Sequence, residues 1–223
     1  MWIIVYFVSL VLWNMKPLFV TGIGTGIGKT LVSAILAEAL EADFWKPIQA
    51  GMEEETDSNW VRNMVTNKKT NIHPETYLLK MPASPHIAAR EEKLKIELGK
   101  IRASFEAIYT EGKLLVIEGA GGLMVPLNEK EFVSDLIKKL QADVILVSRN
   151  YLGSINHSLL TASVCRNLEL AVRGWVFNDQ YLNYEQEIVN WSGYKKLGSV
   201  PKAMDINKRF IQQQAELLKK TLI

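Results

Sequence analysis

The sequence of 223 residues contains a single cysteine, Cys165, and carries a formal net charge of only +2. One cysteine excludes an internal disulfide framework and suits a reducing compartment, so we expect a cytoplasmic protein. The small net charge, without a dense run of lysine and arginine, gives no electrostatic reason to expect a nucleic-acid partner. Cys165 lies in an apolar helical stretch, which indicates a small buried side chain rather than a nucleophile.

The N-terminal segment is apolar but too short to cross a membrane, which takes roughly 20 residues. Residues 1–14 read MWIIVYFVSLVLWN, and they lack the basic start and the small-residue cleavage site of a signal peptide. A second methionine, Met15, directly precedes a predicted strand. We therefore expect residues 1–14 to be an extension from an upstream start, with residues 15–223 forming one domain and no membrane partner. A peripheral membrane anchor is the alternative interpretation.

Along the rest of the chain, short apolar runs alternate with patterns of helical spacing. LLVIE and ADVILVS are continuous apolar runs, typical of strands that are buried on both faces. Strands that alternate with crossover helices predict an α/β fold of the doubly wound type, with a mostly parallel sheet and helices on both faces. The least regular stretch, residues 66–92, is expected to be an active-site flap or a surface loop.

The segment VTGIGTGIGKT, residues 20–30, has four glycines before a Lys-Thr pair. It fits neither the dinucleotide fingerprint nor the strict phosphate-loop pattern, because Gly22 comes one residue early for the latter. With a strand before it and a helix after it, however, its backbone N–H groups and the helix N-terminus lie where a phosphate binds. Lys29 would contact the terminal phosphates and the Thr30 hydroxyl would ligate Mg²⁺. The segment therefore predicts nucleotide binding.

Three more charged residues follow predicted strands, at the sheet edge where α/β proteins bind ligands. Lys46, at the end of the predicted strand DFWKPI, would clamp a phosphoryl group or an anionic substrate, although a strand-end lysine is often only surface decoration. Asp57 opens a short predicted helix, and helix capping is its alternative role. Glu118 ends an apolar strand, where Mg²⁺ is the expected partner of a buried carboxylate. Two acids and Thr30 around Mg²⁺ describe a phosphoryl-transfer site.

Together with KPIQAG, VIEGAGGLMVPL, LGSINHSLLT and GWVFND, the glycine segment resembles the ordered motifs of dethiobiotin synthetases over residues 17–201. The resemblance implies a P-loop, ATP- and Mg²⁺-dependent cyclo-ligase that acts as a homodimer. In that family 7,8-diaminononanoate takes up CO₂ on one amine to form a carbamate, which ATP phosphorylates. The second amine then closes the ureido ring, and ADP and phosphate are released.

The resemblance also implies a role for each matching residue. The expected ATP-binding set is Thr25, Gly26, Ile27, Gly28, Lys29, Thr30 and Leu31 around the phosphates, Gly119, Ala120 and Gly121 after the third strand, and Asn178, Asp179 and Pro201 at the adenine. Thr30, Asp57 and Glu118 would hold Mg²⁺, while Lys46 and Lys29 would be catalytic. The expected substrate set is Lys46, Ala50 and the helix start formed by Gly153, Ser154, Ile155 and Asn156, which receives the substrate carboxylate across a dimer interface.

The sequence departs from the family pattern at the loop and after Lys46. Gly24 and Gly26 stand where the family often has acids, and Ala50 stands where it often has serine. We expect these changes to alter the affinity for substrate. Two other functions stay open: a nucleotide-switch or partner-regulating P-loop ATPase, and a catalytically weakened relative. Partitioning-type ATPases, however, carry a lysine at the position of Gly24.

Overall fold

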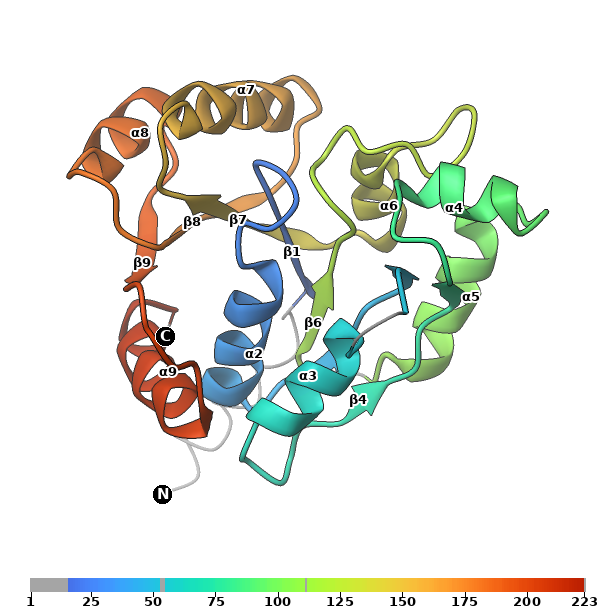
Figure 1. Ribbon diagram of the computed structural model, residues 1–223, viewed down its shortest axis with the longest axis horizontal. Helices are drawn as coiled ribbons and strands as arrows, with labels where there is room; N and C mark the ends of the chain where they lie inside the picture. Colours follow the sequence, from blue (N-terminus) through green and yellow to red (C-terminus); the bar gives the residue numbers. More distant parts are fainter. Residues whose placement is uncertain (1–15, 53–54, 111, 223) are drawn as a thin grey trace, which may run out of the picture.

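A parallel β-sheet forms the centre of the molecule (Figure 1). The computed structural model describes residues 16–52, 55–110 and 112–222. Within these residues the sheet has seven strands in the order β4-β2-β6-β1-β7-β8-β9, all paired in parallel. The strands are β1 (Leu18–Gly22), β2 (Asp43–Trp45), β4 (Ile72–His73), β6 (Leu115–Glu118), β7 (Asp143–Arg149), β8 (Val172–Asn178) and β9 (Lys196–Val200). The predicted α/β class with a parallel sheet is confirmed.

Helices cover both faces of this sheet, because its inner strands bury side chains on both sides. In the described residues they are α2 (Lys29–Leu40), α3 (Asp57–Met64), α4 (Pro85–Glu91), α5 (Leu98–Ile108), α6 (Val133–Leu140), α7 (Ser154–Asn167), α8 (Glu185–Ser192) and α9 (Lys208–Leu222). On β1, Val20 belongs to the apolar cluster under α2, α3 and α9, whereas its neighbour Phe19 belongs to the cluster under α5, α6, α7 and α8. The sequence pattern did not predict α5 and α8.

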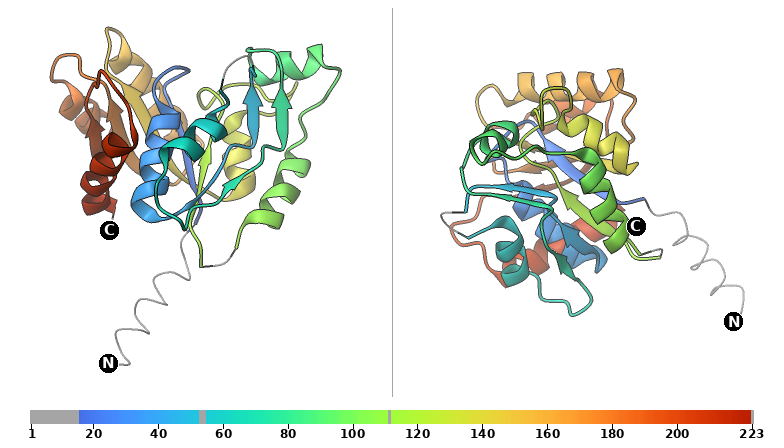
Figure 2. Two further views of the ribbon diagram at one scale, coloured as in Figure 1. Left: turned by 60° about the horizontal axis from the view of Figure 1, so that its bottom comes forward. Right: turned by 90° about the vertical axis from the view of Figure 1, so that its right-hand side faces the viewer.

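The predicted strand DFWKPI is wrong as a single element, because it divides at Pro47. Proline has no N–H to donate to a ladder, so β2 ends at Trp45 in the main sheet. The chain then enters β3 (Ile48–Ala50), which pairs in parallel with β5 (Tyr77–Leu79) in a small second sheet. Figure 2 shows these two strands side by side, apart from the main sheet. Lys46 therefore lies at the junction between the two sheets.

The stretch expected to be a flap or loop, residues 66–92, is more regular than predicted. It contributes β4, β5 and α4, and the carbonyl of Pro47 accepts the N–H groups of Thr76 and Tyr77, each at 3.0 Å. Short elements held mainly by contacts distant in sequence leave little periodicity to read.

In residues 16–222, apart from the three that the structure does not describe, no helix is long and apolar enough to cross a membrane. The predicted extension, residues 1–14, lies outside the described part.

Candidate active site

The glycine segment forms the loop between β1 and α2 and wraps the start of that helix. Gly28 precedes the helix with a φ of +89°, and a Cβ on it would lie 2.0 Å from the side-chain nitrogen of Asn178. Only glycine accommodates both the left-handed backbone and this contact. The first N–H groups of α2 consequently face the loop, and N–H groups at a helix start are suited to bind an anion. Phosphate binding at this loop stays a prediction.

Lys29 lies buried inside this loop. Its Nζ donates a hydrogen bond to the carbonyl oxygen of Gly24 at 2.7 Å. Burial lowers the pKa of Lys29 from 10.5 to about 8, partly opposed by the negative charge of Glu118. The ammonium group is therefore held at the loop, and its contact with the terminal phosphates stays a prediction.

Four residues meet beside the loop: Thr30 of α2, Asp57 of α3, Glu118 of β6, and Lys46 from the link between β2 and β3. The Thr30 hydroxyl lies 2.8 Å from Glu118 Oε1 and 3.0 Å from Asp57 Oδ1. Lys46 Nζ donates to Glu118 Oε1 at 3.0 Å and forms a second ion pair with Asp57. Burial alone would lower the pKa of Lys46, but the charges of Glu118 and Asp57 outweigh it and raise the pKa above 10.5. The strand-end lysine is thus part of a buried cluster rather than surface decoration.

Asp57 is free to join this cluster because another residue caps its helix. The N-cap of α3 is Thr56, whose hydroxyl accepts the N–H of Asn59 at 3.3 Å. Asp57 occupies the first helical position, with its carboxylate turned towards Lys46 and Thr30. The capping alternative for Asp57 is therefore wrong.

The chemistry of this cluster fits a magnesium ion. Glu118 is 1% exposed, and among the described residues its Oε2 has no hydrogen-bond partner. An unpaired buried carboxylate oxygen is costly unless a cation takes it up. With Asp57 and the Thr30 hydroxyl, it offers a few hard oxygen ligands, the kind that Mg²⁺ uses while keeping positions for phosphate and water.

A cleft of about 680 Å³ opens over the cluster. Loop residues, Lys46, Ala50, Ala120 and Gly121 line it, and so do Pro82 to Pro85 from the stretch expected to be irregular. Three predicted ligand residues are placed differently. Ile27 and Leu31 bury their side chains under the sheet, and a Cβ on Gly119 would lie 2.6 Å from the ring of Phe19. Packing alone thus explains why these three positions hold isoleucine, leucine and glycine. Only their backbone groups remain available to a ligand.

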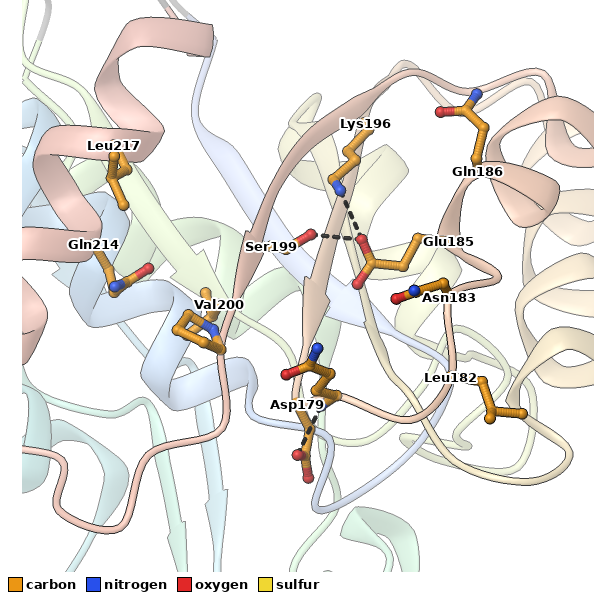
Figure 3. Close-up of a pocket in the computed structure, with 12 residues that line it drawn as sticks. Asp179, Leu182, Asn183, Glu185, Gln186, Lys196, Ser199, Val200, Gln214 and Leu217 are labelled. Atoms are coloured by element: carbon orange, nitrogen blue, oxygen red, sulfur yellow. Dashed lines mark hydrogen bonds and ion pairs between the residues drawn. The ribbon is translucent and has the colours of Figure 1, made fainter.

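The residues expected at the adenine lie on the other side of the loop. Asn178 Nδ2 donates to the carbonyl oxygen of Ile27 at 2.9 Å, so its side chain supports the phosphate loop. Asp179 and Pro201 line a separate hollow of about 560 Å³ between α8 and α9 (Figure 3). In that hollow the carboxylate of Glu185 accepts hydrogen bonds from Lys196 and Ser199, at 2.7 and 2.5 Å. The structure thus brings Asp179 and Pro201 together.

The predicted substrate helix start lies away from the cleft. Gly153 precedes α7 with a φ of +102°, and Ser154, Ile155 and Asn156 form its first turn. Ser154 is buried, with its hydroxyl 2.7 Å from that of Tyr184. None of the four lines the 680 Å³ cleft of the same chain. In the same helix, Nδ1 of His157 lies 2.7 Å from the Tyr151 hydroxyl.

Sequence reasoning missed Arg149, which ends β7 at the tip of the phosphate loop. Its guanidinium lies 2.9 Å from Asp179 Oδ2. A signal was present, because Arg149 ends an apolar strand just as Glu118 does. Gln49 and Pro82 to Ser84, which also line the cleft, carry no such pattern.

Comparisons with known proteins show the fold and the family of the chain. The AAA domain family matches residues 16–209. Among solved structures, the septum site-determining protein MinD complexed with Mg-ADP from Pyrococcus horikoshii is similar with a TM-score of 0.58, at 14% identity over 93% of this chain and 94% of that one. A ParA family ATPase from Chlorobium tepidum is similar with a TM-score of 0.53, at 13% identity over 94% and 91%. Fold and site together define a P-loop nucleotide-binding protein.

Curated relatives narrow the class. The chain is 49% identical to the ATP-dependent dethiobiotin synthetase BioD of Cytophaga hutchinsonii, over 90% of this chain and 96% of the relative. It is 44% identical to the same enzyme of Christiangramia forsetii, over 93% and 98%. The chain belongs to the ATP-dependent dethiobiotin synthetase family.

Proposed function

We propose that this chain is the ATP-dependent cyclo-ligase that converts 7,8-diaminononanoate and CO₂ to dethiobiotin. The observation that carries the proposal is the position of Lys46, buried beside the phosphate loop and charged between Glu118 and Asp57. A fixed cation at the floor of a cleft matches a reaction whose intermediates are anions. The family membership supplies the identity of those anions.

The reaction needs charge stabilisation and orientation more than a strong base. A carbamate oxygen attacks the γ-phosphorus of ATP, ADP leaves, and a carbamic-phosphoric anhydride forms. The second amine then attacks the carbonyl carbon, expels phosphate and loses a proton as the ring closes. Lys46 would hold the carbamate and the phosphoryl group in place, and Lys29 with the loop N–H groups would hold the phosphates of ATP.

Thr30, Asp57 and Glu118 would hold Mg²⁺, and the unpaired Glu118 Oε2 supports that assignment. The ion, when bound, neutralises charge on phosphate oxygens. The ion pairs that Lys46 makes with both acids imply that these contacts rearrange when metal and nucleotide bind.

The departures from the family pattern affect binding rather than the chemical step. Ala50 lines the cleft beside Lys46, so a hydroxyl contact to the diamine is missing. Gly26 has a φ of +70°, and a Cβ on it would meet nothing within 4 Å. We expect weaker diamine binding than in relatives with serine at position 50.

The chain is proposed to act as a homodimer. The helix start of α7 lies outside its own chain's cleft but presents N–H groups suited to a carboxylate. Leu152, directly before it, is 84% exposed, which suits a surface that another subunit covers. Sedimentation of the purified protein tests this directly, because a monomer at working concentration contradicts it.

The protein is proposed to work in the cytoplasm, where its single cysteine stays reduced.

One assay tests the proposed reaction. ADP release is measured with bicarbonate and Mg²⁺, with and without 7,8-diaminononanoate, and dethiobiotin is identified by mass. ADP release that requires the diamine supports the cyclo-ligase. Release that is independent of the diamine supports a nucleotide switch, and diamine-dependent release at a very low rate supports a weakened relative. Gly24, in place of the partitioning-type lysine, argues against the switch.

A further inference from the structure

Arg149 joins two segments that lie far apart in the sequence. Its Nε and Nη2 lie 3.1 and 2.9 Å from Asp179 Oδ2, and its Nη1 donates to the carbonyl oxygen of Gly26 at 3.4 Å. The Arg149 side chain is 47% exposed, whereas that of Asp179 is 15% exposed. Ion pairs at the surface add little to the free energy of unfolding. Stability alone therefore does not explain why Arg149 pairs with Asp179 beside the phosphate loop.

At the tip of the phosphate loop, the carbonyl oxygen of Gly24 accepts the Lys29 ammonium from within the loop, whereas that of Gly26 accepts the Arg149 guanidinium from outside it. Gly24 and Gly26 belong to the tip, and a Cβ on either would meet no atom within 4 Å. A glycine loses more conformational entropy on ordering than any other residue. A ligand that must order the glycine tip therefore binds with lower affinity. A hydrogen bond from outside the loop reduces that loss.

Asp179 is itself held in place by hydrogen bonds, so it can fix the position of the Arg149 side chain. It sits in the turn after β8 with a φ of +66°, and its N–H donates to the carbonyl oxygen of Val200 at 3.1 Å. Its Oδ1 accepts the N–H of Gln180 at 2.8 Å, which leaves Oδ2 for Arg149. Burial tends to raise the pKa of Asp179, but the Gln180 N–H and the Arg149 charge outweigh it and lower the pKa, so the pair is ionised at neutral pH.

We propose that Arg149 is a positioning residue for nucleotide binding, which holds the glycine tip of the phosphate loop against the turn after β8. The inference rests on the proposed function for its nucleotide. In that function the loop binds the phosphates while the turn lies beside the base. A brace between them fixes the distance between the two subsites before the nucleotide arrives. In Arg149→Ala, loss of the brace weakens nucleotide affinity and leaves kcat at saturating ATP nearly unchanged.

The test separates this role from direct contact between Arg149 and a phosphate. Binding of Mg·ADP is measured by calorimetry for Arg149→Ala, Asp179→Asn and the double variant; asparagine tolerates the positive φ at position 179. If Arg149 acts through Asp179, each single change weakens binding about fivefold, and the double variant is no weaker than the weaker single variant. Multiplicative losses, or a loss for Arg149→Ala alone, overturn the proposal.

Arg173→Ala is the matched control. Arg173 lies at the other end of the same two strands, with its Nε 2.7 Å from Asp143 Oδ2 and a similar exposure of 55%. Its removal breaks a comparable ion pair and should leave the affinity for Mg·ADP unchanged. Affinity lost equally in both variants would indicate a general structural effect and overturn the proposal.

The Mg·ADP affinity of Arg149→Lys gives a second test, which can be used if the alanine variant fails to fold. Lysine keeps the charge but cannot hold Asp179 and Gly26 through separate nitrogens of a fork, so affinity should fall between wild type and Arg149→Ala. Wild-type affinity would assign the effect to charge alone, against the proposal. In turnover assays KM for ATP should rise while KM for the diamine stays constant. Because Mg·ADP binding needs no diamine, the outcome stands apart from success or failure of the proposed reaction.

Discussion

The two ends of the central sheet bury acidic residues in different surroundings. At the amino end, Asp43 accepts hydrogen bonds from Lys113 at 2.5 Å, the Asn71 N–H at 2.8 Å and His73 at 3.0 Å. At the carboxyl end, Glu118 shares one oxygen with Lys46 and Thr30 and leaves the other unpaired within the described residues. A satisfied carboxylate stabilises the fold, whereas an unsatisfied one is available to a ligand. Substitutions at the amino end should therefore reduce the free energy of unfolding, whereas substitutions at the carboxyl end should reduce activity or metal binding.

Replacing Lys46 with alanine should have the largest effect on activity. Loss of the cation that holds the carbamate and phosphoryl group should lower kcat at least about a hundredfold while the folded structure remains. Diamine-dependent ADP release measures the loss, and circular dichroism checks the fold. Lys69→Ala is the control, because Lys69 forms an exposed ion pair with Glu41 away from the cleft. Near-normal turnover in Lys46→Ala would remove Lys46 from the mechanism.

Glu118→Gln should change the requirement for metal. Glutamine keeps the volume but removes the charge, so the Mg²⁺ concentration for half-maximal ADP release should rise at least about tenfold. A Mg²⁺ titration of ADP release at fixed ATP gives the value. An unchanged Mg²⁺ requirement would show that Glu118 is not a ligand.

At the amino end, Asp43→Asn should reduce stability without changing KM for ATP. Burial alone would raise the pKa of Asp43, but bonds from Lys113, Asn71 and His73 outweigh it and lower the pKa. The ionised form therefore stabilises the fold above the unfolded-state pKa near 3.9, and this contribution disappears as the pH falls through the lower folded-state pKa. Urea unfolding at pH 7 should show a loss of about 1 to 3 kcal/mol, which shrinks below about pH 4.

The matched control for Asp43→Asn is Glu106→Gln, which breaks an exposed i,i+4 pair with Arg102. That change should cost under about 0.5 kcal/mol. An Asp43→Asn variant whose deficit is the same at pH 7 and pH 3.5 would contradict the assignment to ionised Asp43.

The smallest expected effect belongs to Ala50→Ser. A hydroxyl at this position of the cleft should restore a hydrogen bond to the diamine and lower its KM about twofold to fivefold. Initial rates against diamine concentration measure the shift, with KM for ATP as the internal control. An unchanged KM for the diamine would place the substrate elsewhere in the cleft.

The fold class could be predicted from the strands, and so could the two members of the charged cluster that lie at strand ends, Glu118 and Lys46. Glu118 stands out in the sequence as an acid that ends an apolar run, and the carboxyl ends of parallel strands meet at one edge. The same logic predicts Lys46, although the strand before it ends at Trp45 and does not continue across Pro47. Residues 66–92 could not be predicted, because β4, β5 and α4 are held by contacts that the local sequence does not contain.

Where side chains point was harder to predict than where residues lie. Gly119 matches a family motif, but its missing side chain makes room for Phe19. The α7 start matches a substrate motif, yet tertiary packing places it away from its own chain's cleft. The contacts of Arg149 could not be predicted from the sequence, because its partners Gly26 and Asp179 are distant along the chain.

The central position of β1 has a consequence for how the protein is made. β1 carries the phosphate loop, and it pairs with β6, where Leu18 meets Val116, and with β7, where Leu18 meets Asp143. During synthesis the apolar β1 emerges long before either neighbour exists, so the nucleotide site can form only after most of the chain has left the ribosome. Such non-local parallel pairing slows folding and exposes aggregation-prone strands. We expect refolding in vitro to be slow, and faster with chaperones present.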